Sequence, residues 1–239
     1  MKDFRDIIKS NIQDRDLCEP QIDFQAAIRT RNKMLQYIGT HDEVPMYLLA
    51  PEVKQLIDSV DDLKIAFLIK TLWITGARIS AILKIKESDF NYVDDEEFGR
   101  TWYLSIVKLK VGRKPKDNEE IEDKLPRQII KIMDNNYINS LRVYTATYNI
   151  KPHQKLFNIT RATAYNWIKK AEYDAQRKGI VFPIKIDTYT FRHSHAVQLL
   201  YHGFSRKKIQ MRLGHKKAEN TEIYTRIFEL DNNEKIRFF

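Results

Sequence analysis

The stretch Asp62–Ser80 reads DLKIAFLIKTLWITGARIS, and it decides the fold of the chain. Apolar side chains lie on nearly every side of the helix predicted over Asp62–Thr75, so this helix is expected inside a domain core. Gly76 is expected to end it, and a second, short helix is predicted over Ile79–Ile85. A domain built around such a buried helix is expected to be mainly helical.

Arg78 falls at the corner between these two predicted helices, next to an apolar layer formed by Leu72, Trp73 and Ile82. A half-buried guanidinium needs an anionic partner, because burying an unpaired charge is costly. Two readings of Arg78 stay open at this point. It is either a structural arginine paired inside the protein or a residue that binds an anionic ligand.

The remaining elements follow from hydrophobic spacing, caps and stop residues. Helices are predicted over Phe24–Ile38, Arg127–Asn135, Arg161–Lys178 with Thr160 as cap and Gly179 as stop, Thr188–His202 and Arg206–Leu213. Trp102–Lys110 alternates and is rich in strand-forming residues, and Ile121–Leu125 is a weaker strand candidate, which together predict a β-hairpin with lysines at its tip. The predicted fold is mainly α with a small antiparallel β-sheet (α+β).

The chain of 239 residues is predicted to form a short N-terminal helical arm over residues 1–45 and one main domain over residues 46–239, with a C-terminal tail over about 229–239. The pattern changes near Pro45, and Pro51 suits the first turn of a new helix.

Charge and composition narrow the class of protein. The net charge is +9, from 41 Lys and Arg against 32 Asp and Glu, which is compatible with a polyanionic partner such as nucleic acid. Cys18 is the single cysteine, so one chain cannot build a disulfide framework or a cysteine-based metal site. The sequence has no signal-peptide core and no apolar run of membrane-spanning length, so a cytoplasmic protein without a membrane partner is expected.

Two motifs carry a resemblance to a known family. The first is Thr75-Gly76-Ala77-Arg78-Ile79-Ser80, and the second is Tyr189-Thr190-Phe191-Arg192 followed by Leu213-Gly214-His215 and, nine residues after the histidine, Tyr224. Their order and spacing resemble the tyrosine recombinase (phage integrase) family, over about residues 48–228. The resemblance implies the tyrosine recombinase catalytic-domain fold and a site-specific DNA recombinase acting in DNA integration, excision, inversion or resolution.

The resemblance also implies a mechanism and a set of catalytic residues. A tyrosine attacks a DNA phosphodiester to give a covalent 3'-phosphotyrosine, and a second strand reverses this step, without a metal or another cofactor. In the family, two arginines clamp the charged phosphate oxygens, a histidine donates to them, and a hairpin lysine protonates the leaving hydroxyl. Carried over to this chain, the catalytic residues are Arg78, Lys110, Tyr189, Arg192, His215 and Tyr224.

Some positions depart from the family pattern or leave alternatives. Lys110-Val111-Gly112 best matches the family's lysine, with Lys114 as the second candidate. Tyr189 stands where most relatives have histidine or lysine, so it is either a neutral donor to the phosphate or a packing aromatic. Ala81 replaces an acid often found in the family, whereas Asp89 stands where the family often keeps one.

The expected partner is double-stranded DNA. The family implies a homo-oligomer on DNA, expected to be a tetramer during strand exchange, with a monomer in free solution; Glu229–Phe239 is the expected docking tail. Two other functions stay open. One is a catalytically weak DNA-binding accessory protein that keeps the fold, and the other is a topoisomerase that relaxes supercoils without site preference.

Overall fold

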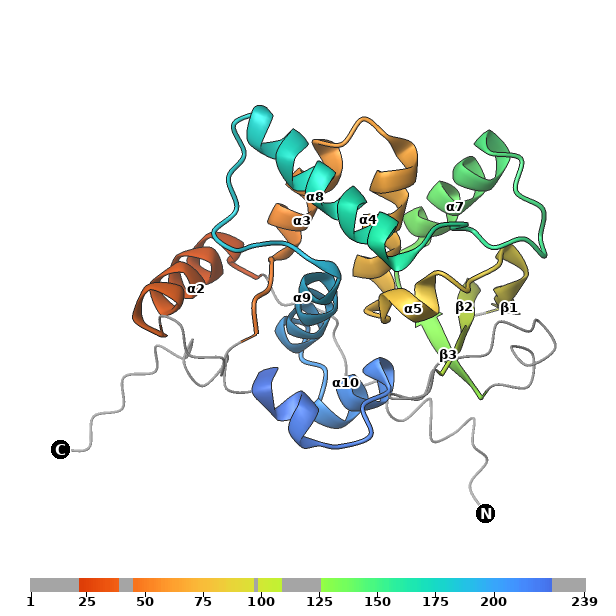
Figure 1. Ribbon diagram of the computed structural model, residues 1–239. Coiled ribbons are helices and arrows are strands. Elements are labelled where there is room, and N and C mark those ends of the chain that lie inside the picture. The colour runs from red at the N-terminus through yellow and green to blue at the C-terminus, as the bar shows by residue number, and fades with distance from the viewer. Residues whose placement is uncertain (1–21, 39–44, 97–98, 109–125, 225–239) are drawn as a thin grey trace, which may run out of the picture.

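The computed structural model describes residues 22–38, 45–96, 99–108 and 126–224. Helices dominate, and a single three-stranded sheet lies at one side of them (Figure 1). This arrangement confirms the predicted architecture of a mainly helical domain with a small antiparallel sheet. In this described part of the chain, no helix is long and apolar enough to cross a membrane.

Helix α4 (Leu63–Thr75) is the centre of the larger hydrophobic core. Asp62 caps its start by accepting a hydrogen bond from the Lys64 amide at 2.8 Å, and Gly76 ends it in the left-handed conformation at φ 61°. The helix is buried on most sides and contacts α3 (Ala50–Asp58), α5 (Ile79–Ile82), α7 (Asn135–Thr147), α8 (Arg161–Arg177), α9 (Thr188–Tyr201) and strand β3 (Arg127–Ile132). The prediction of an interior helix over this stretch is therefore confirmed.

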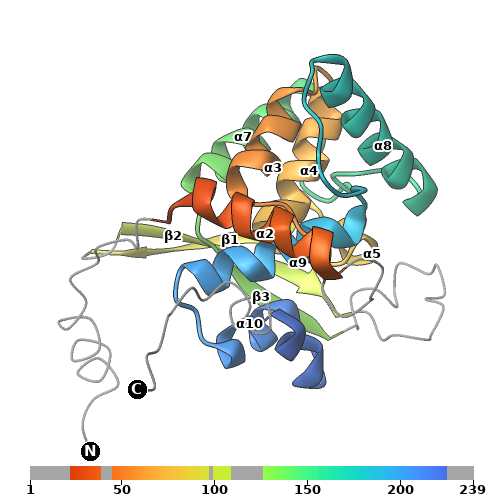
Figure 2. The same cartoon turned by 90° about the vertical axis from the view of Figure 1, so that its left-hand side faces the viewer.

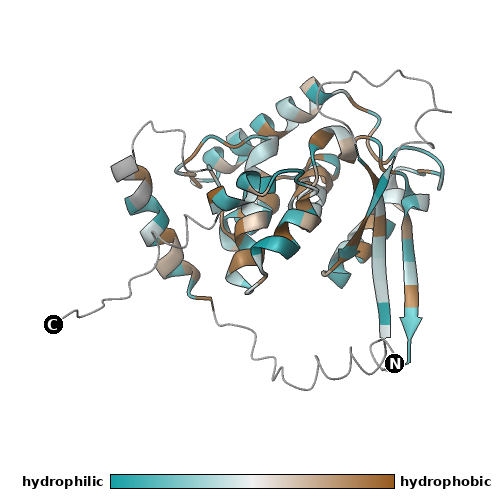
Figure 3. Ribbon diagram, turned by 90° about the horizontal axis from the view of Figure 1, so that it is seen from below, coloured by the Kyte–Doolittle hydropathy of each residue, from teal (hydrophilic) through white to brown (hydrophobic). Residues whose placement is uncertain are grey.

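The sheet has the order β1-β2-β3, with both pairs antiparallel. Strand β1 (Phe90–Asp95) pairs Phe90 with Leu104 of β2 (Gly99–Val107), and β2 in turn pairs Leu104 with Ile130 of β3. The buried side chains of β2 and β3 face the helices, whereas most of β1 is exposed. Figure 3 shows hydrophilic colour at the ends of the strands that extend beyond the helices.

The helix predicted over Arg127–Asn135 is wrong, because this segment forms β3 and the next helix begins only at Asn135. Ile130 and Ile132 are buried while Ile129 and Lys131 are exposed, which is the two-residue period of a strand. β-branched isoleucines favour this conformation once β2 offers an edge to pair with. Asp134 then caps α7 by accepting a hydrogen bond from the Asn136 amide at 2.8 Å.

Further differences concern the end of α5 and two elements that were not predicted. Helix α5 stops at Ile82, three residues earlier than predicted. Strand β1 and helix α7 are absent from the predicted elements, because FNYVDD and NNYINSLRVYTAT carry weak local signals. The strand candidate Ile121–Leu125 lies outside the described residues.

The C-terminal helices agree closely with prediction. Helix α8 begins after Thr160, whose hydroxyl accepts from the Thr163 amide at 3.1 Å, and α9 and α10 (Arg206–Leu213) have nearly the predicted bounds. Figure 2 shows α3, α4, α7 and α8 on one side of the sheet and α10 on the other. Helix α9 crosses between the two groups, so residues on α9 can contact both.

A second, smaller hydrophobic cluster lies where helix α2 (Phe24–Ile38) meets α9 and α10. Its buried members are Ala27, Tyr47, Leu49, Ala196, Val197, Leu199, Ile209, Leu213 and Tyr224. Arg31 of α2 is 1% exposed, and its guanidinium donates to both carboxylate oxygens of Glu52 at 2.5 and 2.7 Å. This buried ion pair ties α2 to the start of α3. We call the hydrophobic residues of this second cluster, without the ion pair, the Tyr224 cluster.

Candidate active site

Arg192 is held at the middle of the candidate site by α9. Asp187 caps this helix, since its carboxylate accepts from the amides of Tyr189 and Thr190 at 2.7 and 2.8 Å. The Arg192 side chain is 5% exposed and donates to the carbonyl oxygens of Gly76 at 2.8 Å and Leu213 at 2.7 Å. Arg192 therefore joins the two motifs that the sequence placed 116 residues apart along the chain.

Arg78 shares a cavity with Arg192 and Tyr189. Arg78 is the N-cap residue of α5 and has an extended backbone at the corner that follows Gly76. The cavity has a volume of about 260 Å³ and is also lined by Ile79, Ser80, Arg161, Tyr165 and Thr188. Tyr189 is 57% exposed, so its side chain is available to a ligand in this cavity.

Among the described residues that line this cavity, no carboxylate balances the arginine charges. Burial, together with the positive charge of Arg78, lowers the pKa of Arg192 to about 10. Arg192 remains protonated at neutral pH, and the repulsion between the two guanidinium groups would be relieved by an anion bound between them. The cavity therefore has the charge and the donors for a phosphate group.

Tyr224 lies in a helical turn that begins at Glu219, and its side chain is 1% exposed. Its hydroxyl oxygen is 3.0 Å from Nδ1 of His193. Burial raises the pKa of Tyr224 to about 12, while the charges of Arg192 and Arg78 act in the opposite direction. Both arginines thus act on the phenol oxygen, and they favour negative charge on it.

His215 faces the same tyrosine from the end of α10. Gly214 ends that helix at φ 66°, and His215 then directs Nδ1 to the hydroxyl of Thr221 at 2.8 Å. The His215 and Tyr224 rings are 6.4 Å apart between centroids, with planes 13° apart. Burial and the charge of Arg192 lower the pKa of His215 to about 4, so its imidazole is neutral at pH 7.

A second network of hydrogen bonds, not predicted from the sequence, fixes the end of α10. Arg212 donates to the carbonyl oxygens of Lys131 at 2.5 Å and Ile74 at 3.1 Å, and its Nε is 3.3 Å from Nε2 of His195. His195 in turn donates through Nδ1 to the Trp73 carbonyl at 2.8 Å. Four elements, α4, α9, α10 and β3, are thereby joined next to the corner that carries Arg78.

Two glycines are required by close approaches in this region. A Cβ atom at Gly76 would lie 2.4 Å from Cδ2 of His195, and one at Gly214 would lie 2.7 Å from Oε1 of Gln128. The side-chain Nε2 of Gln128 donates to the carbonyl oxygens of Met211 and Arg212 at 2.7 and 2.8 Å. A side chain at Gly76 would therefore push α4 away from α9, whereas one at Gly214 would displace the Gln128 side chain and strain the left-handed backbone there.

The structure brings most, but not all, of the predicted catalytic residues together at one site. Arg78, Tyr189, Arg192, His215 and Tyr224 lie around one site, whereas Lys110 and Lys114 lie outside the described residues. Asp89 forms an ion pair with Arg127 on the sheet, and Ala81 is buried in the larger core.

His193 is the site residue that the sequence analysis missed. It directly follows Arg192, and it lies four residues after Tyr189 on the same helix. A histidine at that spacing could have been singled out, since residues four apart in a helix share a face. What the sequence could not give was its contact with Tyr224, 31 residues further on.

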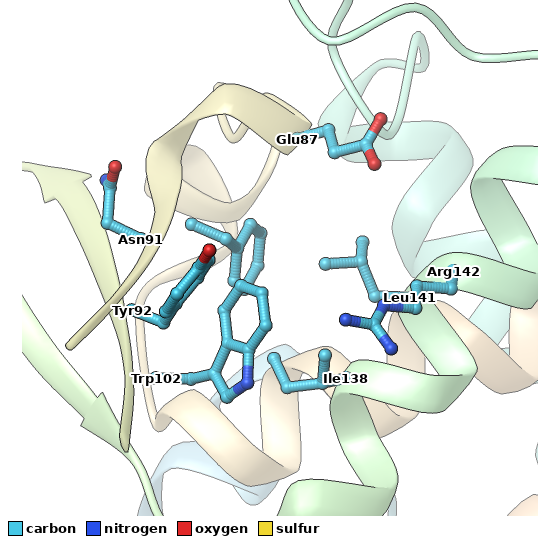
Figure 4. A pocket seen from close by; sticks show the side chains of 8 residues that line it. Glu87, Asn91, Tyr92, Trp102, Ile138, Leu141 and Arg142 are labelled. Atoms are coloured by element: carbon cyan, nitrogen blue, oxygen red, sulfur yellow. The ribbon is translucent and has the colours of Figure 1, made fainter. Parts of the chain in front are cut away.

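A second cavity, of about 310 Å³, lies between β1, β2 and α7 (Figure 4). Its lining includes Tyr92, Trp102, Ile138, Leu141 and Arg142, and none of the residues named for the active site. The guanidinium of Arg142 lies 5.6 Å from the centre of the Trp102 ring. This cavity is separate from the arginine and tyrosine cluster.

Comparison with known proteins agrees with this geometry. The model of the phage integrase family matches residues 46–230. A protein named "Resolvase" from Escherichia coli is 32% identical over 225 residues, which covers 88% of this chain and 83% of that protein. A "Probable site-specific recombinase in afa region", also from Escherichia coli, is 32% identical over 212 residues, covering 89% of this chain and 81% of that protein.

Solved structures have the same fold. XerA recombinase is 25% identical with a TM-score of 0.55, over 77% of this chain and 60% of that chain. XerH site-specific recombinase in a pre-cleavage complex with its difH substrate has a TM-score of 0.56 at 20% identity, over 78% of this chain and 52% of that chain. The present chain thus corresponds to little more than half the length of these solved chains.

The fold and the relatives define the class as a site-specific recombinase of the tyrosine type. The chain belongs to the phage integrase family.

Proposed function

We propose that Tyr224 is the nucleophile that cleaves double-stranded DNA and forms a covalent 3'-phosphotyrosine. The phenol oxygen attacks the phosphorus, and the bond from phosphorus to the leaving deoxyribose oxygen breaks. The observation that supports this role is the field of Arg78 and Arg192 on the buried phenol oxygen. Rejoining reverses the step with the hydroxyl of another strand.

Arg78 and Arg192 clamp the non-bridging oxygens of the attacked phosphate in this proposal. They face one open cavity, and the phosphate offsets the repulsion between them. Tyr189 adds a neutral hydroxyl donor to the same oxygens, and His215 donates from the end of α10. The lysine that protonates the leaving oxygen is Lys110, with Lys114 as the second candidate. No cofactor and no metal enter this proposed mechanism.

The Tyr224 hydroxyl has to become accessible to phosphorus. The helical turn that carries it is joined to α10 through Lys216, Lys217 and Ala218, which are exposed and non-helical. Displacement of this turn toward the cavity exposes the phenol without disturbing the larger core. The connector thus has a function in the proposed reaction.

We assign DNA breakage and rejoining to residues 46–239 and treat residues 1–45 as a helical arm. The partner is double-stranded DNA, and assembly on DNA is proposed to be tetrameric during exchange, from a monomer in free solution. Among the possible outcomes, resolution between two sites on one DNA is to be tested first, because the Escherichia coli relative is named a resolvase.

The deciding experiment captures the covalent adduct. The full chain is incubated with a pool of nicked suicide duplexes that contain a randomised core, and the DNA left attached to protein after denaturation is sequenced. Wild type is expected to give an adduct in the presence of a chelator, and Tyr224→Phe to give none while still binding DNA. An adduct from Tyr224→Phe would contradict the assignment, and DNA binding without any adduct would indicate an accessory protein.

A further inference from the structure

His193 is the imidazole in contact with the proposed nucleophile. It projects from α9 at the position after Arg192, and its Nδ1 is 3.0 Å from the Tyr224 hydroxyl oxygen. The two rings are 5.7 Å apart between centroids and tilted by 55°, so they meet through this polar contact rather than by stacking. The distance is that of a hydrogen bond with a single proton between nitrogen and oxygen.

The surroundings keep the His193 ring unprotonated, so a nitrogen is open to the phenol proton, although the ring is a weaker base than a free imidazole. Burial, and next the charge of Arg192, lower the pKa of His193 to about 4, while Asp187 acts in the opposite direction. At neutral pH the ring is therefore uncharged and has one unprotonated nitrogen. The field of Arg78 and Arg192 favours negative charge on the phenol oxygen, which favours Nδ1 as the unprotonated nitrogen.

The other imidazoles and phenols named for this region are less suited to accept the Tyr224 proton. His215 directs Nδ1 to the Thr221 hydroxyl and lies with its ring nearly parallel to the phenol. His195 is engaged with the Trp73 carbonyl and Arg212. Tyr189 stands where the family usually has a basic residue, but its phenol is a poor base.

We propose that His193 is the general base of the cleavage step, accepting the Tyr224 hydroxyl proton through Nδ1. This inference rests on the proposed role of Tyr224 as nucleophile. As the bond from the phenol oxygen to phosphorus forms, the proton moves to Nδ1, and the bond to the leaving deoxyribose oxygen breaks. In the rejoining step the imidazolium returns this proton to the phenol oxygen, so the protein ends as it began.

The first test measures single-turnover adduct formation on the duplexes selected from the randomised pool. His193→Ala is expected to slow cleavage by about 100-fold, the lower range for loss of a general base. His202→Ala is the matched control, because His202 is exposed at the end of the same helix and is expected to leave the rate unchanged. A His193→Ala variant as fast as wild type would overturn the proposal.

A second arm separates proton transfer from positioning. Placing 2,3-difluorotyrosine at position 224 gives a more acidic phenol that needs less help from a base. This substitution is expected to restore most of the rate lost in His193→Ala while changing the His193 protein little. A loss of rate that the acidic phenol does not restore would mean that His193 only positions Tyr224, and would overturn the proposal.

A third arm does not depend on activity. Nitrogen-15 spectra of the histidine rings in the free protein identify which nitrogen of His193 carries the proton. Wild type is expected to show an unprotonated, hydrogen-bonded Nδ1, and Tyr224→Phe to lose that hydrogen bond. A protonated Nδ1 at pH 7 would overturn the proposal even in a protein that cleaves, whereas absence of any adduct from wild type would overturn the proposed function, and the proposal with it.

Discussion

The larger hydrophobic core and the Tyr224 cluster differ in size and in the elements that form them. The larger core surrounds α4 with the sheet, α3, α7 and α8, and Phe67 stacks on Tyr144 at 4.3 Å between ring centroids. The Tyr224 cluster is smaller, and α2 and the turn carrying the tyrosine form part of it. Elements with fewer buried contacts open at lower free energy than the core. Tyr224, the proposed nucleophile, belongs to the smaller cluster, and we therefore expect the turn that carries it to open before the larger core does.

The largest expected effects are losses of unfolding free energy, one from a substitution in the larger core and one from a substitution beside the Tyr224 cluster. Phe67→Ala removes a buried aromatic from the larger core and should cost about 3–5 kcal/mol of global unfolding free energy. Arg31→Ala leaves the Glu52 carboxylate buried without its ion-pair partner, a loss of about 3–5 kcal/mol. Hydrogen exchange is expected to show loss of protection throughout for Phe67→Ala.

For Arg31→Ala, loss of protection is expected mainly in α2 and the turn that carries Tyr224. Arg29→Ala is the matched control, because Arg29 is exposed on the same helix. If Arg31→Ala lowers protection equally in α4 and β2, the two clusters unfold as one unit and the comparison fails.

The next effect concerns catalysis without a matching loss of stability. Arg78 is half-buried at a helix corner, so Arg78→Ala should cut adduct formation by roughly 100-fold while changing the free energy of unfolding little. Arg192→Ala should lose activity to a similar extent and stability as well, because Arg192 also holds the Gly76 and Leu213 carbonyls. Single-turnover cleavage and urea unfolding measure the two quantities. Equal stability of both variants would show that the Arg192 contacts do not stabilise the fold.

Low pH is expected to weaken the contacts that join the two clusters. Burial, and next the charge of Arg212, lower the pKa of His195 to about 3. Because the unfolded chain binds this proton near pH 6.5, the unfolded state gains protons first as pH falls, and stability decreases. From pH 7 to pH 5 the expected loss from His195 is about 2 kcal/mol.

The measurement is urea unfolding of wild type and His195→Gln at several pH values. The variant is expected to be less stable at pH 7 and to show a flatter dependence on pH below 6.5. Identical slopes for the two proteins would mean that His195 is protonated as readily in the folded state as in the unfolded chain.

The smallest expected effect is on the cleavage rate of variants at Tyr189, which lines the arginine cavity. Tyr189 is proposed to give one neutral hydrogen bond to the phosphate, worth on the order of 1 kcal/mol. Tyr189→Phe should therefore slow cleavage about fivefold to tenfold. Tyr189→His should hold or raise the rate, most clearly below pH 7, where imidazolium is populated. If Tyr189→Phe matches wild type across pH, the hydroxyl does not contact the phosphate.

Local signals were enough for most helices. Asp62 and Gly76 mark the two ends of α4, and Thr160 caps α8, because caps and stops act over a few residues. The arginines, His215 and Tyr224 were predicted from motif order and spacing. The structure brings them together, while their catalytic roles and that of Lys110 stay predictions.

Contacts between distant segments decided the features that could not be predicted from the sequence. Residues 127–132 became a strand because β2 offers a pairing edge, although the local pattern was read as a helix. The contact between the Tyr224 hydroxyl and Nδ1 of His193, and the ion pair of Arg31 with Glu52, depend on how distant segments pack. The sequence by itself determined the ends of α4, α8, α9 and α10, because caps and stop residues act over a few neighbours, and its two motifs carried the family resemblance that singled out Arg78, Arg192, His215 and Tyr224. Only the tertiary structure decided which imidazole meets the phenol, because packing, rather than spacing along the chain, sets that distance.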